Sequence, residues 1–118
     1  MKLTFQQDAI LNGINIVLKA VPSKTTMSIL ECIFIDASGS EIKLTANDME
    51  LGIETIVDGE ILEKGKVAIE AKLFSEIVRK LPDSDVIIET DESLQTTIVC
   101  EKAKFNIPGK SGEDFAYL

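Results

Sequence analysis

An internal repeat at an offset of 60 residues constrains the fold of this chain more than any other feature. Pro22 and Pro82 each close a segment of helical periodicity, and the residues that precede them match in kind. The matched apolar pairs are Val21 with Leu81, Leu18 with Val78, Val17 with Ile77 and Ile14 with Phe74, and the bases Lys19 and Arg79 also coincide. Any two amphipathic helices share apolar spacing, so the repeat also depends on the order of the remaining elements.

That order is the same in both halves of the chain. Each half begins with a short strand, continues with an amphipathic helix ended by proline, and then shows three segments of strand-like alternation. The first half has these elements at 2–5, 7–22, 29–37, 41–46 and 51–58, followed by a turn at 59–66. The second half has them at 67–70, 72–81, 86–90, 94–100 and 103–107. The sequence therefore predicts a βαβββ unit used twice.

Two helices from equivalent positions of a duplicated unit should pack side by side on one face of antiparallel sheets, giving an α+β fold. Each helix buries its apolar arc, so the opposite arcs form one common outer surface. On the second helix that arc spans about 100° and carries Lys72, Glu76, Arg79 and Lys80, and on the first it carries Asn12, Asn15 and Lys19. We expect a modestly basic, amide-rich helical layer.

Charge is distributed unevenly along this acidic chain, whose formal net charge is −8. Residues 1–30 and 71–81 each hold three bases and one acid, for a net charge of +2 in each segment. Residues 31–70 carry a net charge of −7 and residues 82–118 a net charge of −5. Positive charge thus collects where helices are predicted, which keeps a polyanion partner possible despite the overall sign. A solvated face that serves only solubility is the competing interpretation.

The residues needed for common catalytic chemistry are missing. The chain has no histidine, no phosphate-binding glycine loop and no dinucleotide fingerprint. Acid pairs occur at Asp83/Asp85 and at Asp91/Glu92, where they could hold Mg²⁺, but acids at such positions commonly form turns. We therefore expect no enzyme, no cofactor and no metal. A carboxylate metal enzyme using the acids at 83–92 stays open as a minor alternative.

The cysteines and the N-terminal residues indicate the cellular compartment in which the protein is expected. Cys32 and Cys100 lie outside any metal-binding or redox motif, and the first residues lack the apolar core of a signal peptide. No apolar run approaches the roughly 20 residues that a membrane span needs. We expect two buried, reduced thiols in a cytoplasmic protein.

Five segments in order resemble the first domain of the bacterial sliding clamp, the β subunit of DNA polymerase III. They are "MKLTF", "KTTMSIL", "IKLTANDMELGIE", "AKLFSEIVRKLP" and "AKFNIPGKSGEDFAYL". The resemblance is collinear over residues 1–118 and implies the same duplicated βαβββ domain. It also implies three such domains in each chain, so that residues 109–118 would begin the linker to the second domain.

The resemblance implies a non-catalytic function in DNA replication. Two clamp chains close head to tail into a homodimeric ring around double-stranded DNA, with helices lining the hole and sheets forming the rim. The lining contacts phosphates without sequence preference. Such a ring tethers DNA polymerase III, while the groove that binds polymerase and clamp-loader peptides lies in later domains. A stand-alone interaction module that docks a partner through edge strand 103–107 is the alternative function.

The family's functional residues carry over to particular positions here. Lys24, Lys72 and Arg79 match basic DNA-contacting positions, and the helical arcs add Lys19 and Lys80 to that set. The family's ring closure maps onto the last strand, with Phe105 and Ile107 as apolar contacts and Lys102 and Lys104 as partners for acids. Leu73 and Ile77 would lie nearby, although Leu73 departs from the lysine of some members.

Overall fold

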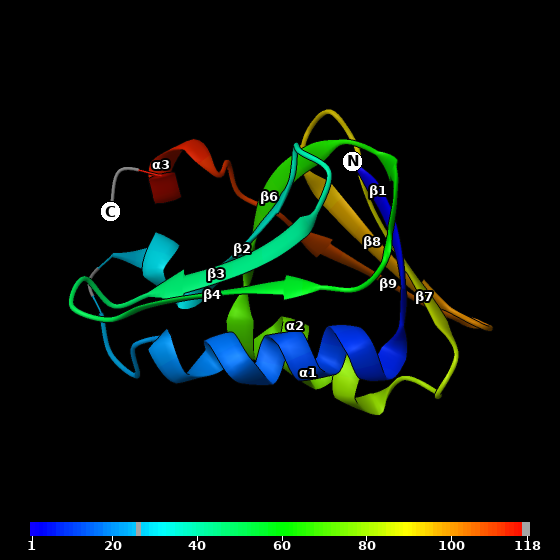
Figure 1. Ribbon diagram of the computed structural model, residues 1–118, viewed down its shortest axis with the longest axis horizontal. Helices are drawn as coiled ribbons and strands as arrows, with labels where there is room; N and C mark the ends of the chain where they lie inside the picture. The colour runs from blue at the N-terminus through cyan, green and yellow to red at the C-terminus, as the bar shows by residue number, and fades with distance from the viewer. Residues whose placement is uncertain (26, 117–118) are drawn as a thin grey trace.

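The computed structural model describes residues 1–25 and 27–116. In this part of the chain two antiparallel sheets lie above a pair of helices, α1 (Gln7–Val17) and α2 (Ala71–Lys80), which pack against each other along one side of the molecule (Figure 1). The predicted fold class, two helices on one face of antiparallel sheets, is confirmed.

The two sheets exchange strands between the repeats. The first sheet has the order β5-β1-β7-β8-β9 and the second has the order β4-β3-β2-β6. The first sheet thus combines β1 and β5 with β7, β8 and β9 of the second repeat. The second sheet combines β2, β3 and β4 of the first repeat with β6, which is the first strand of the second repeat. The strands span Lys2–Gln6 (β1), Cys32–Ala37 (β2), Ile42–Asn47 (β3), Gly52–Val57 (β4), Glu60–Glu63 (β5), Gly65–Glu70 (β6), Asp85–Thr90 (β7), Gln95–Cys100 (β8) and Ala103–Pro108 (β9).

The sequence prediction was wrong for one strand. The segment 59–66, predicted as a turn, contains β5, which pairs with β1 at the edge of its sheet. Of its four residues only Ile61 is partly buried, because β5 lies at the edge of its sheet and has no further strand beside it among the described residues. The strand therefore lacks the alternation that marks a half-buried strand, and its pairing with β1 could not be seen locally.

The two helices match at their C-terminal ends more closely than at their starts. Val21 N–H donates to Leu18 O and Leu81 N–H donates to Val78 O, which are equivalent bonds at an offset of 60 residues. The first helix begins earlier: α1 and the 3₁₀ turn η1 (Leu18–Ala20) have 11 and 3 residues, against 10 in α2. The helical segment of the first repeat is thus about one turn longer than that of the second.

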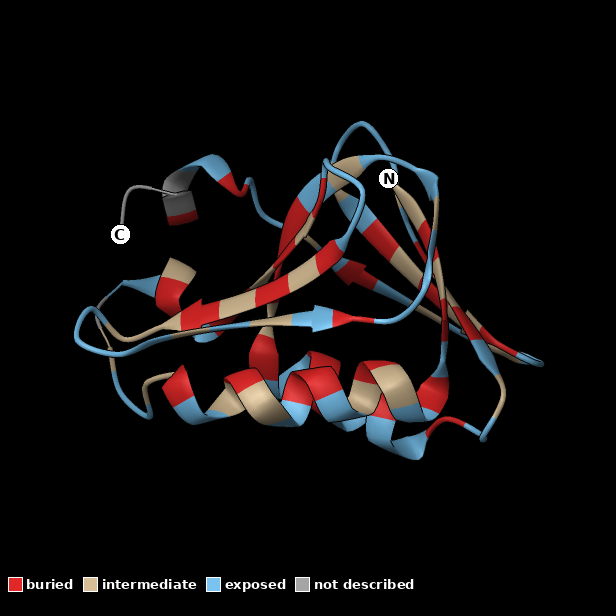
Figure 2. Cartoon of the chain, viewed as in Figure 1, coloured by how far each residue is buried: buried red, intermediate tan, exposed pale blue. Residues whose placement is uncertain are grey.

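A single hydrophobic core lies between the sheets and the helices. Alternate strand residues and the inner arcs of both helices are buried, whereas the lower sides of the helices are exposed (Figure 2). Among the largest fully buried side chains are Phe74, Leu3, Ile10, Ile14, Ile33 and Ile88. Burial of these apolar groups fixes which face of each helix is left to water.

The C-terminal segment packs back onto the domain. Lys110 forms a β-bridge with Ala68 of β6, and Phe115 in the short helix α3 (Glu113–Ala116) stacks on Phe34 of β2 at a ring-centroid distance of 5.4 Å. The linker expected at 109–118 therefore begins in a segment that contacts the domain, and its last two residues, 117 and 118, lie outside the described residues.

Both cysteines are buried and unpaired, as the sequence indicated. Burial raises the pKa of the Cys32 thiol and that of the Cys100 thiol above the ordinary value. Both therefore stay protonated at neutral pH. In the part of the chain that is described, no helix has the length and apolar character needed to span a membrane.

Candidate nucleic-acid interface

The outer ridge of α1 changes in charge along its length. Asp8, Asn12, Asn15 and Lys19 are all exposed, and their spacing of four, three and four residues places them on one face. Asp8 lies in the first turn, where a carboxylate interacts favourably with the helix dipole. The ridge therefore runs from an acid, through two amides, to a base.

The outer face of α2 is more strongly basic. Lys72, Arg79 and Lys80 are exposed, with Glu76 as the acid among them. The Glu70 carboxylate caps the helix by accepting a 2.7 Å hydrogen bond from Leu73 N–H. Arg79 and Lys80 lie in the last turn, where positive charge stabilises a helix end. The buried face and the caps together hold the basic side chains outward.

The antiparallel arrangement of the helices gathers the bases at two ends of this surface. Gln7, at the start of α1, donates a 2.8 Å hydrogen bond from Nε2 to the carbonyl of Val78, near the end of α2. At the other end, a hollow of about 100 Å³ lined by Val21, Ser23 and Lys72 joins the chain after α1 to the start of α2. Lys19, Lys24 and Lys72 therefore lie towards one end, and Arg79 and Lys80 towards the other.

No ion pair joins these cations to a carboxylate among the side chains that the structure describes. The one ion pair found among the side chains of residues 1–25, 27–113 and 115 joins Lys43 Nζ to Glu54 Oε1 at 3.8 Å, on the second sheet. Arg79 instead donates a 2.9 Å hydrogen bond from Nη2 to Ser75 Oγ, which steadies the guanidinium without removing its charge. We call the exposed set Asn12, Asn15, Lys19, Lys24, Lys72, Arg79 and Lys80 the helical face.

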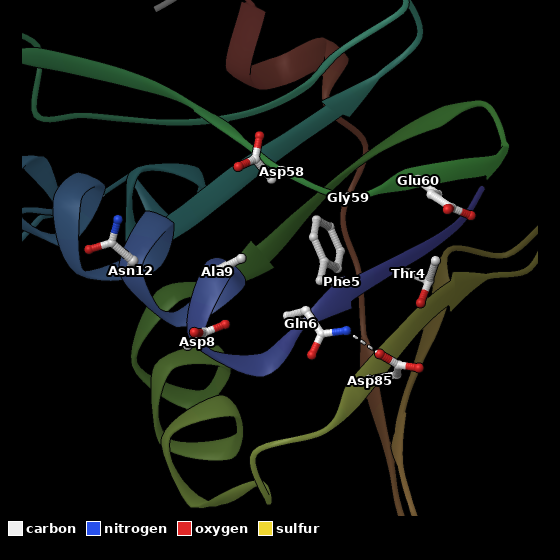
Figure 3. A pocket seen from close by; sticks show the side chains of 10 residues that line it. All are labelled: Thr4, Phe5, Gln6, Asp8, Ala9, Asn12, Asp58, Gly59, Glu60 and Asp85. Atoms are coloured by element: carbon white, nitrogen blue, oxygen red, sulfur yellow. Dashed lines mark hydrogen bonds between the residues drawn. The ribbon is translucent and has the colours of Figure 1, made fainter.

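An acidic hollow opens beside the start of α1, between β1, β5 and β7 (Figure 3). Its volume is about 930 Å³, and its lining includes Asp8, Asp58, Glu60 and Asp85. The amide of Gln6 is hydrogen-bonded to Asp85 there, as the dashed line in Figure 3 marks. No three His, Cys, Asp or Glu side chains of the described residues come together in an arrangement that could hold a metal ion.

Two of the acids that might have supported metal chemistry, Asp85 and Asp91, have structural roles. Asp91 accepts hydrogen bonds from the backbone N–H groups of Ser93 and Gln95, at 2.8 and 3.0 Å, and so shapes the turn between β7 and β8. Asp85 is held by Gln6, as described above. These contacts favour a structural role for Asp85, the first residue of β7, and for Asp91 over a role in a catalytic pair.

The family model for the N-terminal domain of the DNA polymerase III beta subunit matches residues 1–118. The chain belongs to this family. Curated relatives include the beta sliding clamps of Staphylococcus epidermidis and Bacillus subtilis, which are 38% and 37% identical over 126 aligned positions. Each alignment covers 100% of this chain and 33% of the relative. The resemblance found in the sequence is confirmed.

Solved structures agree with this beta-subunit assignment. A putative DNA polymerase III beta subunit from Eubacterium rectale superposes with a TM-score of 0.98 at 69% identity, over 100% of this chain and 32% of that one. The DNA polymerase sliding clamp of Bacillus subtilis gives a TM-score of 0.94 at 36% identity, over 100% and 33%. This beta-subunit domain thus spans about a third of the length of these relatives.

The last strand of the beta-subunit domain is an edge strand, as the sequence predicted. β9 pairs with β8 on one side, and its other side has no strand partner among the described residues. Lys102 and Lys104 are exposed, and Phe105 packs partly against the core, which leaves the rest of its side chain accessible at the edge. Ile107 is only 5% exposed and belongs to the domain's own core, so the expectation of a free apolar contact there needs correction.

The two α2 residues assigned to the same interface differ in the same way. Leu73 is 39% exposed and Ile77 is 6% exposed, because Leu73 lies towards the outer face of the helix and Ile77 on its inner arc. Sequence reasoning missed the role of Ser75, which receives the Arg79 hydrogen bond. The four-residue spacing of Ser75 and Arg79 was the available signal, since side chains at that spacing are neighbours on a helix.

Proposed function

We propose that this chain is the first of three domains of a ring-shaped DNA clamp. Two such three-domain chains close head to tail, and the ring encircles double-stranded DNA in the cytoplasm. The observation that carries the proposal is the helical face: in a beta-subunit domain of net charge −8, four exposed bases lie on two packed helical segments, and a fifth, Lys24, follows the first of them. Such a face suits the phosphates of a duplex running past it.

The proposed contact is electrostatic and independent of sequence. Lysine and arginine side chains on a helix face reach phosphates, which position a protein on DNA but do not identify bases. Binding of this kind lets a ring move along the duplex. The clamp performs no chemistry in this proposal. It tethers DNA polymerase III and meets the clamp loader through grooves in the later domains.

Ring closure is assigned to β9. The open edge of that strand, with Phe105 beside it and Lys102 and Lys104 exposed, would pair with the third domain of the partner chain. Leu73 would add exposed apolar surface, whereas Ile77 and Ile107 are buried in the domain's own core. The same edge would serve a stand-alone interaction module, but membership of the beta-subunit family favours ring closure.

Retention on DNA then comes from topology and not from affinity. The isolated domain offers at most five bases to the duplex. Each phosphate that a base neutralises changes the slope of log binding constant against log salt concentration by only about 0.9. The net charge of −8 repels the polyanion beyond the helical face. We expect the isolated domain to show no measurable binding at about 0.15 M salt, whereas a closed ring stays on a closed circle because it cannot leave without opening.

The test compares loading of full-length clamps onto circular DNA. A variant with Lys24→Glu, Lys72→Glu and Arg79→Glu should load poorly and slide off linearised DNA faster, while remaining a dimer in sedimentation. A control with Lys64→Glu, Lys66→Glu and Lys110→Glu makes the same charge change at exposed positions outside the helices. Equal loading by both variants would refute the helical face as the DNA contact. Micromolar binding by the isolated domain would refute the topological argument.

A further inference from the structure

Two of the large apolar side chains that the fold leaves exposed lie beside one hollow. Ile56, near the end of β4, is 54% exposed, and Leu62, in β5, is 52% exposed. Both line a hollow of about 630 Å³, together with Ile61 and Val57. A single exposed apolar side chain is ordinary, whereas several that converge on one concavity are typical of a contact surface.

This hollow lies where the two sheets meet. The turn between β2 and β3 and the end of β4 line it from the second sheet, and β5 lines it from the first. We call it the edge hollow, because β5 pairs with β1 on one side and has no strand on its other side among the described residues. Exposed apolar side chains thus lie beside a strand that has unpaired backbone groups.

Neither contact of the proposed function uses the edge hollow. In the strand order β5-β1-β7-β8-β9, the strands β5 and β9 form opposite edges of one sheet, so ring closure through β9 leaves β5 open. The described lining of the edge hollow includes no member of the helical face. The hollow is therefore available to a further partner.

The charges around the edge hollow are mostly negative. Glu41 and Asp58 belong to its lining, and Glu60 and Glu63 are exposed on β5. Lys64 is the one base among the described lining residues. Charged side chains on an open strand edge discourage indiscriminate pairing. Because these charges are nearly all of one sign, they would repel an acidic strand and attract a basic one.

We propose that the edge hollow binds an extended segment of a partner protein that carries both apolar and basic side chains. The backbone of the segment pairs with the open edge of β5, in the manner of a strand added to a sheet. Its apolar side chains pack on Ile56 and Leu62, and its bases lie beside Glu41 and Asp58. This contact is independent of DNA binding and of ring closure.

The experiment uses a fluorescent peptide of about six residues, the usual length of a strand, in which lysine and valine alternate. Fluorescence anisotropy measures its binding to the full-length protein, and a glutamate–valine peptide of equal length is the comparison. The lysine peptide should bind, more weakly as salt rises, and the glutamate peptide should be repelled. The absence of saturable binding by the lysine peptide at millimolar concentration, or equal binding of both peptides, would overturn the proposal.

A substitution at an exposed apolar position checks where the peptide binds. Leu62→Asp should weaken binding of the lysine peptide roughly tenfold or more, because an apolar contact of that size is lost. Met49→Asp is the control, since Met49 is an exposed apolar side chain on the turn between β3 and β4, outside the lining of the edge hollow. An equal effect of the two substitutions, or no effect of Leu62→Asp, would contradict binding at this hollow.

A charge reversal tests the chemistry of the partner in a way that misfolding cannot imitate. Glu41→Lys with Asp58→Lys should exchange the preference, so that the glutamate peptide binds and the lysine peptide binds less. An unchanged preference would reject the charge complementarity on which the choice of partner depends. Sedimentation provides a last check: assemblies larger than the proposed dimer that disappear with Leu62→Asp would assign the hollow to a second copy of the chain and refute the proposal.

Discussion

Gln7 and Val78 join the beginning of one helix to the end of the other. The Gln7 side chain is 8% exposed, and its Nε2 donates to the Val78 carbonyl, which also accepts the Leu81 N–H bond that closes α2. This contact links the two halves of the repeat at one end of the helical face. The antiparallel order of the helices, and with it the spacing of the bases, depends on such contacts.

Removal of this contact should loosen the helix pair. Gln7→Ala deletes the buried donor, and we expect a loss of about 1 kcal/mol in the free energy of unfolding. Urea denaturation followed by far-UV circular dichroism measures the difference. Gln95→Ala is the control, since that amide is exposed and outside the helices. Equal stability of both variants would show that the Gln7 bond contributes nothing net.

A glycine sets how closely α1 approaches the second sheet. A Cβ at Gly13 would lie 2.5 Å from Val57 Cγ2 and 3.2 Å from Leu44 Cδ1, and the stiff valine side chain cannot rotate away freely. Gly13→Ala should therefore cost about 1–3 kcal/mol through overpacking, partly offset by about 1 kcal/mol of helix propensity. Thermal unfolding tests this prediction. Gly39→Ala meets nothing within 4 Å and should change stability little; a stabilised Gly13→Ala variant would contradict the close packing.

The turn between β3 and β4 should respond to acid through Asp48. The N–H groups of Leu51 and then Glu50 donate to its carboxylate and lower the pKa of Asp48 below the ordinary value. Stabilisation by a carboxylate with a lowered pKa is present above the unfolded-state pKa of about 3.9 and is lost as pH falls through the folded-state pKa. We expect the Leu51 amide resonance to shift below about pH 4. Asp48→Asn, which cannot titrate, should show no such shift; a pH-independent wild-type resonance would contradict this account.

Ring closure through β9 can be tested at one residue. Phe105→Asp in the full-length protein should give monomers in sedimentation, because a charge would replace the half-buried apolar contact at the open edge. Ile107→Asp is unsuitable, since a carboxylate at a position that is 5% exposed would unfold the domain. Asn106→Asp, on the same strand but facing away, is the control. An undiminished dimer in the Phe105→Asp variant would exclude this interface.

The sequence by itself determined the elements whose patterns are local. Helical periodicity closed by Pro22 and Pro82 located both helices, and alternation located every strand except β5. The exposed side of each helix followed from the same patterns, because burial of an apolar arc leaves the opposite arc in water. Four bases of the helical face, Lys19, Lys72, Arg79 and Lys80, lie on the arcs predicted in this way, whereas Lys24 was named from the family resemblance alone; all five are exposed.

The tertiary structure alone decided how the halves combine. Strand alternation shows which side of a strand is buried but not which strand it pairs with, so the exchange of β1 and β6 between the repeats was invisible in the sequence. The same limit hid β5, whose edge position removes the burial signal, and the burial of Ile107 by residues distant in sequence. Partners of this kind are fixed by long-range packing of the whole core, which no local pattern encodes.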